Sequence, residues 1–347
     1  MPTLRDVPVS VLDLAPVVSG STASVALENS VQLVHLAERL GLTRYWVAEH
    51  HNMPGIASSA PAVLIAHLAA ATDRIRVGSG GVMLPNHTSL VVAEEFGTLE
   101  ALHPGRIDLG IGRAPGTDPA TAAALRRSVD ALSAEDFPQQ LMDLLGFFTG
   151  EFPERHPYAQ MTAMPGRGNM PSIWLLGSSG YSAQVAGLLG LPFAFAHHFS
   201  ADSTVPALRL YREAFRPSDV LGEPYAMIGV SVICAESDDE AHRLAAPGVL
   251  SFVRLRSGRP GPLPTPREAA EHEFTLAERR IVESRSTGQV VGGPGAVRRQ
   301  LDELLAATGA DELMVTTMVY DQAERLASYE RVAELAGLAQ RTVAAAV

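Results

Sequence analysis

Residues Arg74–Gly116 have the sequence RIRVGSGGVMLPNHTSLVVAEEFGTLEALHPGRIDLGIGRAPG, and this stretch decides the fold. It predicts a strand over Arg76–Gly80, a helix over Ser89–Leu102 and a second strand over Arg106–Ile111. The strand segments are short apolar runs without the strict alternation of a half-exposed strand. Such runs are typical of parallel strands that helices cover. The stretch therefore predicts a β-α-β unit.

The same rhythm of strand and helix runs along the whole chain. It predicts eight strands, each followed by at least one helix. The predicted strands are Val9–Leu14, Tyr45–Glu49, Arg76–Gly80, Arg106–Ile111, Ser172–Leu176, Phe193–Ala196, Met227–Ala235 and Glu312–Thr317. The predicted helices are Ala26–Leu40, Pro61–Ala71, Ser89–Leu102, Pro119–Leu132, Phe137–Thr149, Ser182–Leu189, Thr204–Phe215, Ser237–Leu255 and Ala323–Ala344.

Two architectures accommodate eight such units: a closed barrel and a doubly wound open sheet. A length of 347 residues suits a barrel with insertions. No G-x-G-x-x-G motif follows the first strand, which disfavours a dinucleotide-binding open sheet. We therefore predict an α/β fold, a (β/α)8 TIM barrel, that forms a single domain over residues 1–347.

Two stretches depart from the rhythm. Residues 151–171 are rich in Pro, Gly and Met, and residues 256–290 contain only one helical piece, Arg267–Ser284. Loops this long in a compact domain are usually lids or disordered segments, so we treat both stretches as insertions and 256–290 as a candidate lid. The run Gly292–Gly295 resembles a phosphate loop in composition, but its Pro294 favours the start of a helix.

Composition excludes several classes of protein. The net charge of −11 disfavours nucleic acid as a partner, and the 46% apolar content argues against disorder. The single cysteine, Cys234, excludes an intrachain disulfide, a cysteine-rich zinc site and a cysteine-held iron–sulfur cluster. The start of the chain does not resemble a signal peptide, and no apolar run is long enough to span a bilayer. We expect a soluble, cytoplasmic protein without a membrane partner.

Histidines follow two of the predicted strands, at the end of the barrel where active sites lie. His50 and His51 follow the second strand, and His197 and His198 follow the sixth. A histidine titrates near neutral pH and suits proton transfer, although a structural, hydrogen-bonded role for His50 is equally compatible with the sequence. Adjacent residues of an extended segment point to opposite faces, so each pair offers one metal ligand at most. We therefore predict no metal site.

Glycines, serines and an arginine suggest an anion site. Gly177, Ser178 and Ser179 stand at the start of a helix, where free backbone N–H groups attract phosphate, although a serine there is also an ordinary N-cap. Arg113 ends the fourth strand and needs a counter-charge, either a phosphate or the nearby carboxylate of Asp118.

The pair Gly80-Gly81 has two interpretations. It is either a simple β-bulge or a bare stretch of backbone against which a planar ring lies.

Four stretches together resemble the bacterial luciferase-like monooxygenases. They are Tyr45–Pro54 (YWVAEHHNMP), Arg74–Gly116, Ile173–Phe199 (IWLLGSSGYSAQVAGLLGLPFAFAHHF) and Val290–Val315 (VVGGPGAVRRQLDELLAATGADELMV). Their order and separation along nearly the whole chain make the resemblance specific. It implies a (β/α)8 barrel that forms a homodimer. The implied cofactor is reduced FMN, supplied by a separate flavin reductase, and in a sister branch the deazaflavin coenzyme. Oxygen and the reduced flavin then oxidise a small organic substrate.

The resemblance also implies roles for particular residues. His50 matches the catalytic histidine of the family's EHH motif, and Gly80-Gly81 the site of a non-prolyl cis peptide beside the flavin ring. The implied cofactor-binding residues are Gly80, Gly81, Gly112, Arg113, Gly177, Ser178, Ser179, Tyr181 and His197. Luciferase itself has a reactive cysteine near the position of Gly112 and an acidic residue at that of Gly177, so bioluminescence is not implied.

Three functions follow from these observations. The first is an FMN-dependent monooxygenase that uses oxygen and a small-molecule substrate. The second is a deazaflavin-dependent hydride-transfer oxidoreductase on the same barrel, and the third is a non-catalytic flavin-binding protein. The presence of His50 argues against the third.

Overall fold

The computed structural model describes residues 2–113, 119–126 and 136–338. Its strands are β1 (Val9–Asp13), β2 (Arg44–Val47), β3 (Arg76–Met83), β4 (Ile107–Gly112), β5 (Ser172–Gly177), β6 (Phe193–Phe195), β7 (Ala226–Cys234), β8 (Gln289–Gly292) and β9 (Glu312–Thr316). Its α-helices are α1 (Ala23–Arg39), α2 (Pro61–Ala70), α3 (Ser89–Leu102), α4 (Pro119–Arg126), α5 (Phe137–Thr149), α6 (Gly180–Leu189), α7 (Thr204–Ala214), α8 (Asp238–Arg256), α9 (Pro266–Glu271), α10 (Leu276–Ser286), α11 (Pro294–Thr308) and α12 (Gln322–Leu335).

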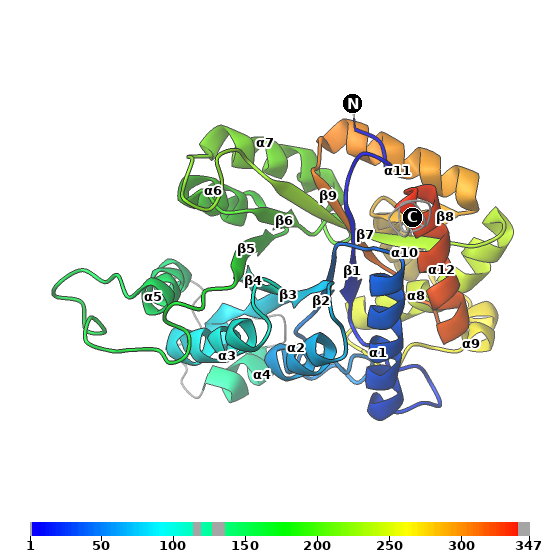
Figure 1. The fold of residues 1–347 in the computed structure, drawn as a ribbon. Coiled ribbons are helices and arrows are strands. Elements are labelled where there is room, and N and C mark those ends of the chain that lie inside the picture. The colour runs from blue at the N-terminus through cyan, green and yellow to red at the C-terminus, as the bar shows by residue number, and fades with distance from the viewer. Residues whose placement is uncertain (1, 114–118, 127–135, 339–347) are drawn as a thin grey trace.

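Eight parallel strands close into a barrel, as predicted. Their order is β6-β5-β4-β3-β2-β1-β9-β7, and a further pairing of β6 with β7 closes the ring. Helices surround it, and α11, with Pro294 in its first turn, begins where the sequence predicts a helix (Figure 1). The predicted helices over 119–132 and 323–344 end at Arg126 and Leu335 in the described residues, whereas 127–132 and 339–344 lie outside them.

The prediction of eight strands missed one. β8 is a short parallel strand that pairs Gln289 with Ser231 and Gly292 with Cys234, along the second half of β7. It lies outside the closed ring because β9 already occupies the first half of β7, from Met227 to Ser231. Its four residues begin within the 256–290 segment, so their strand character did not stand out as part of the eightfold rhythm.

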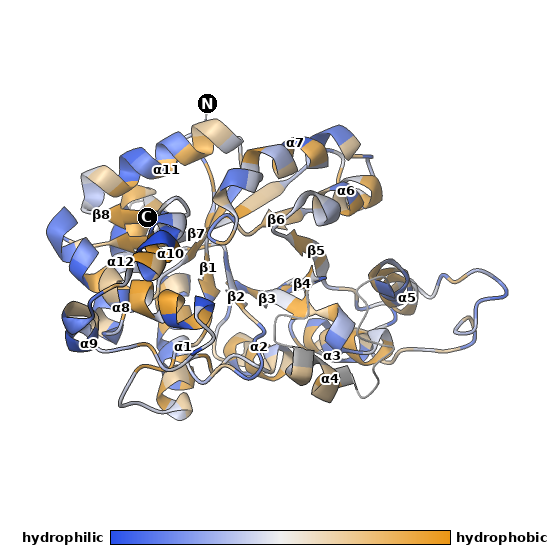
Figure 2. Cartoon of the chain, turned by 180° about the vertical axis from the view of Figure 1, so that it is seen from behind, coloured by the Kyte–Doolittle hydropathy of each residue, from blue (hydrophilic) through white to orange (hydrophobic). Residues whose placement is uncertain are grey.

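Side chains that point into the barrel form successive layers, because alternate residues of a strand face the same side. Arg44 and Glu312 occupy the amino-terminal layer. Trp46 and Met314, two residues further along the same strands, belong to the apolar cluster in the middle, together with Leu12, Trp174 and Met227. The rings of Trp46 and Trp174 meet edge to face, with centroids 5.3 Å apart. A larger apolar core lies between the strands and the helices, and the central strands are mostly apolar in colour in Figure 2.

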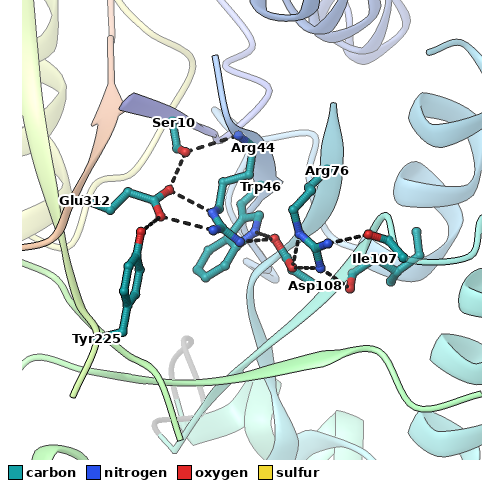
Figure 3. A network of polar contacts seen from close by, with 9 residues as sticks. Ser10, Arg44, Trp46, Arg76, Ile107, Asp108, Tyr225 and Glu312 are labelled. Carbon is teal, nitrogen blue, oxygen red and sulfur yellow. Dashed lines mark hydrogen bonds and ion pairs between the residues drawn. The ribbon is translucent and has the colours of Figure 1, made fainter. Parts of the chain in front are cut away.

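A buried network of charges closes the amino-terminal end of the barrel (Figure 3). The guanidinium of Arg44 donates to Glu312 at 2.7 Å and to Asp108 at 2.7 Å, and both carboxylates are fully buried. Arg76 also donates to Asp108, at 2.5 Å. Opposite charges thus compensate one another in the interior and tie β2, β3, β4 and β9 together.

A second buried ion pair holds α12 against the barrel. Arg325 donates to Asp13 at 2.6 Å, and the hydroxyl groups of Tyr45 and Ser30 donate to the same carboxylate at 2.5 Å. Asp13 stands at the end of β1, where a carboxylate suggests catalysis. Its donors occupy it fully, so its role is structural.

The helical piece predicted over Arg267–Ser284, within residues 256–290, is two short helices. They are α9 and α10, each begun by a capping box, at Thr265/Glu268 and Thr275/Glu278. The segment is tied to the loop after β1, because the backbone of Leu263 bonds with that of Val17 and of Ser19 at 2.8 Å each. Residues 151–171 extend away from the barrel after α5 (Figure 1). The lid role of 256–290 and the single domain over 1–347 stay predictions.

The described residues contain no helix that combines the length and the apolar character needed to cross a membrane.

We expect Arg44→Met to lower the free energy of unfolding by about 3–5 kcal/mol, because it leaves two buried carboxylates without their shared cation. Urea denaturation followed by circular dichroism measures this loss. Arg267→Met is the matched control, since Arg267 pairs with Glu271 on the surface at 2.8 Å and such pairs contribute less than about 1 kcal/mol. Equal losses in the two variants would contradict the structural role of Arg44.

Candidate active site

A cavity lies at the carboxyl ends of the barrel strands. Its walls come from the loops after β1, β2, β6 and β9, from β7 and β8, and from α8 and α10. The polar lining residues are His50, His198, Ser231, Ser251, Arg285, Gln289 and Thr316. The apolar ones include Leu14, Ile56, Phe252, Leu255, Leu263 and Met318. An apolar pocket with a few converging polar groups is the usual form of a small-molecule site.

His50 lines this cavity, as expected for a strand-end residue. Its backbone N–H donates to the carbonyl of Ser58 at 3.0 Å, which fixes the chain after β2. Its Nδ1 atom is buried and has no hydrogen-bond partner among the described residues. Burial lowers the pKa of the imidazole below its ordinary value, so His50 is neutral at pH 7. An uncharged imidazole with a free ring nitrogen can accept or donate a proton.

His51 does not share the surroundings of His50 but contacts the carboxylate of Glu49. The Nε2 atoms of His51 and His87 both lie 2.9 Å from Oε1 of Glu49, which is fully buried. Burial acts to raise the pKa of Glu49, but the hydrogen bond and charge of His87, together with the hydrogen bonds from Met83 and His51, outweigh it and lower the pKa. This ionised carboxylate also accepts the backbone N–H of Met83 at 3.0 Å and so joins β2 to the end of β3.

The histidine of the sixth strand that reaches the cavity is His198. Its Nδ1–H donates to the carbonyl of Gly229 on β7 at 2.8 Å, and burial lowers its pKa to about 4. His197, the predicted flavin neighbour, bonds instead with the hydroxyl of Thr204 at 2.8 Å and is not part of the cavity wall. The flavin role of His197 stays a prediction, and the structure offers His198 as the side chain in contact with the cavity.

The predicted phosphate-binding residues come together outside the cavity, after β4 and β5. The guanidinium of Arg113 lies over the ring of Tyr181, 4.5 Å from its centroid, and Arg113 has no ion pair with a described residue. Ser179 is the N-cap of α6, yet its side chain makes no capping hydrogen bond. Ser178 and Ser179 are both exposed. The hydroxyl groups and the helix N-terminus are therefore available to an anion. Asp118, the alternative partner of Arg113, lies outside the described residues.

Gly80 and Gly81 lie within β3 rather than after it. The bond between them is cis, as the family resemblance implies, and the register with β4 shifts between Gly80 and Val82. A Cβ atom on Gly80 would meet Leu12 Cδ1 at 2.7 Å, and one on Gly81 would meet the carbonyl oxygen of Gly110 at 2.6 Å. The backbone of β4 therefore leaves no room for a side chain at Gly81, whereas at Gly80 the side chain of Leu12 would have to shift. The contact of both glycines with a flavin ring stays a prediction.

Two more predicted glycines are also confined by their neighbours. A Cβ atom on Gly112 would approach Met83 Sδ to 2.9 Å, and one on Gly177 would approach Ser182 Cβ to 2.9 Å. Close packing explains why both positions lack a side chain. Their cofactor roles stay predictions.

The sequence interpretation missed several polar residues of the site. Ser231 and Thr316 lie on the carboxyl-terminal halves of β7 and β9, and Oγ1 of Thr316 is buried without a partner among the described residues. Arg285 belongs to α10, in the segment expected to be a loop. The alternation along β9 places Glu312, Met314 and Thr316 on one face, and this was the available signal for Thr316. No comparable signal distinguished Arg285.

No three side chains among the described His, Cys, Asp and Glu residues are arranged to hold a metal ion. Burial raises the pKa of the Cys234 thiol to about 11, which makes it a poor nucleophile.

The fold and the site define a TIM-barrel protein with a small-molecule site at the carboxyl ends of its strands. The model of the luciferase-like monooxygenase family matches residues 7–312, and the chain belongs to this family. It is 46% identical over 328 residues to an Escherichia coli K12 protein named luciferase-like monooxygenase, a match that covers 94% of this chain and 96% of that protein. It is similar to the crystal structure of apo-MsnO8, with 41% identity, a TM-score of 0.84 and coverage of 96% and 99%.

More distant structures share the fold alone. The oxygenating constituent of 3,6-diketocamphane monooxygenase from Pseudomonas putida, in complex with FMN, has 19% identity, a TM-score of 0.70 and coverage of 96% and 98%. An F420-dependent secondary alcohol dehydrogenase has 12% identity, a TM-score of 0.64 and coverage of 95% and 99%. The same barrel thus holds two different flavin-type cofactors in other proteins.

We expect the His198 imidazole to make stability pH-dependent. Because its pKa is about 4 in the folded protein and about 6.5 in an unfolded chain, the unfolded state binds an extra proton between these values. The free energy of unfolding should therefore fall as the pH drops from about 6.5 towards 4. His198→Asn, which keeps a donor for Gly229, should make this fall smaller. Urea denaturation at pH 7 and pH 5 measures the difference.

The exposed residue His67 provides the control for this experiment, and His67→Asn should leave the pH dependence unchanged. An unaltered pH dependence in His198→Asn would contradict the burial of a neutral imidazole at this position.

Proposed function

We propose that the protein is an FMN-dependent monooxygenase that oxidises a small organic molecule with dioxygen. One observation carries the proposal: Arg113 stacks on Tyr181 without a carboxylate partner among the described residues, beside the open N-terminus of α6, at the same end of the barrel as the His50 cavity. This arrangement suits a ligand with a phosphate at one end and a reactive group at the other. Membership of the luciferase-like monooxygenase family supports the same proposal.

The residues present fit FMN. Arg113 supplies a guanidinium for the phosphate, Ser178 and Ser179 supply free hydroxyl groups, and the first N–H groups of α6 add the positive end of a helix dipole. Tyr181 orients the guanidinium by stacking under it. When bound, reduced FMN supplies two electrons, so that one atom of dioxygen enters the substrate and the other leaves as water.

His50 is the residue that we assign to proton transfer. Its neutral imidazole lines the cavity, and its unpartnered Nδ1 atom is the ring nitrogen that can hold a proton for a reacting group. Thr316 and Ser231 add hydroxyl groups to the same cavity, which can orient the substrate.

Exclusion of water is the second contribution of this chain to the reaction. The cavity is walled by apolar side chains from α8 and from residues 256–290, among them Phe252, Leu255 and Leu263. A water-poor site protects a reactive oxidant from hydrolysis. We expect the 256–290 segment to act as a lid over the bound substrate.

FMN is favoured over the deazaflavin coenzyme. The relative at 46% identity is named a monooxygenase, whereas the F420-dependent dehydrogenase shares only 12% of its residues with this chain. We further propose that a separate reductase supplies reduced FMN, that the protein forms a homodimer, and that it works in the cytoplasm.

We expect Arg113→Gln to weaken FMN binding about 10–100-fold, because a charge-assisted contact to the phosphate is lost. Riboflavin, which has no phosphate, should bind within about threefold of wild type. Fluorescence quenching of each flavin measures both constants. Arg209→Gln, in an exposed helical ion pair, is the control and should change neither. An equal loss for both flavins would remove Arg113 from the phosphate site.

We expect His50→Gln to lower turnover about 10²–10⁴-fold while FMN binds as in wild type. The assay is oxygen-dependent product formation from candidate substrates in the presence of a flavin reductase. Because the pKa of His50 is lowered, the wild-type rate should decline only as the pH falls below 6.5, where the imidazole becomes protonated. Unchanged turnover in His50→Gln would contradict the catalytic assignment.

A further inference from the structure

Arg285 is a cation on the cavity wall that lacks an acidic partner. No carboxylate of a described residue forms an ion pair with it. The two most deeply buried arginines of the barrel differ in this respect, since Arg44 pairs with Asp108 and Glu312, and Arg325 pairs with Asp13. A guanidinium withdrawn from water without a counter-charge destabilises the protein unless an anion joins it.

The groups that surround Arg285 hold it in place without neutralising it. Its guanidinium lies over the ring of Phe252, 4.7 Å from the centroid. With the amide of Gln289 turned so that its oxygen faces Arg285, this oxygen accepts from Nε at 3.0 Å and from one terminal nitrogen at 3.1 Å. A guanidinium has five N–H donors, so donors remain for a ligand. Aromatic stacking and two hydrogen bonds to one amide oxygen orient a binding group in this way.

Among the residues that the structure describes, Arg285 also supplies the only formal charge on the cavity wall. Burial lowers its pKa to about 10, so it stays protonated at neutral pH, and no described Asp or Glu lines the cavity. His50 and His198 are neutral there because burial lowers the pKa of both. The cavity is therefore positive within a chain whose net charge is −11.

From this arrangement we infer that the substrate is an organic acid, with an apolar body that contacts Ile56, Leu255 and Leu263 and a carboxylate that pairs with Arg285. The inference rests on the proposed function, because it names the substrate class of the same site. The planar fork of a guanidinium matches a carboxylate in two parallel hydrogen bonds. The anion at Arg285 is distinct from the flavin phosphate, since Arg113 and Tyr181 do not line this cavity.

The first experiment tests whether Arg285 is a binding group or a structural one. Arg285→Met should leave the midpoint of thermal unfolding within about 2 °C of wild type or raise it, because a cation without an acidic partner is removed. Arg325→Met is the matched variant and should lower the midpoint by at least about 6 °C, because Asp13 loses its buried partner. A loss in Arg285→Met as large as that in Arg325→Met would overturn the inference.

The second experiment tests the ligand with matched pairs of probes. Acetate, benzoate and octanoate are compared with acetamide, benzamide and octanamide by calorimetric titration of the full chain loaded with FMN. At least one acid should bind about tenfold or more tightly than its amide. Arg285→Gln should abolish this preference, and Arg285→Lys should retain part of it. Equal binding of acids and amides in wild type, or a preference that survives in Arg285→Gln, would overturn the inference.

FMN binding separates this inference from the proposed function. Arg285→Gln should bind FMN within about threefold of wild type, whereas a loss of FMN affinity without a change in acid binding would assign Arg285 to the flavin and overturn the inference. Failure of the wild type to bind FMN would instead contradict the proposed function. The acid preference, measured without FMN, would then still decide the role of Arg285.

Discussion

The structure depends on the contact that Arg44 makes with Asp108 and Glu312 across the floor of the barrel. This contact joins β2 to β4 and β9, which lie on either side of it in the closed ring. The charges balance only when all these strands keep their register, because each carboxylate would otherwise be buried alone. Above this floor, Trp46 and Trp174 fill the barrel. Gly78 and Gly80 of β3 leave space for the ring of Trp46.

The arginines at the two ends of the barrel differ in whether a carboxylate pairs with them. At the floor each guanidinium has a carboxylate partner, whereas Arg113 and Arg285, near the carboxyl ends of the strands, have none among the described residues. This contrast supports the proposal that anions bind at the carboxyl ends of the strands.

The two cations Arg113 and Arg285 lie at different positions around the barrel. Arg113 follows β4 and Tyr181 follows β5. The cavity lies instead at the ends of β2, β6, β7 and β9, and its lining includes His50, His198 and Arg285. A cofactor with its phosphate at the first position has its other end free to face the second. The roles that we propose for His50 in proton transfer and for Arg285 in substrate recognition therefore belong to one cavity, away from the proposed phosphate site.

The eightfold alternation of strands and helices and the family could be predicted from the sequence. So could the positions of His50 and Arg113 at strand ends, because all of these follow from local patterns of apolar residues, glycines and caps. The sequence did not reveal β8, the pairing of Arg44 with Asp108 and Glu312, or which of His197 and His198 reaches the cavity. Those features depend on contacts between residues far apart in the chain. Only the tertiary structure shows that Arg285 has no carboxylate partner among the described residues. A missing counter-charge is visible only when the neighbours from every packed element are known.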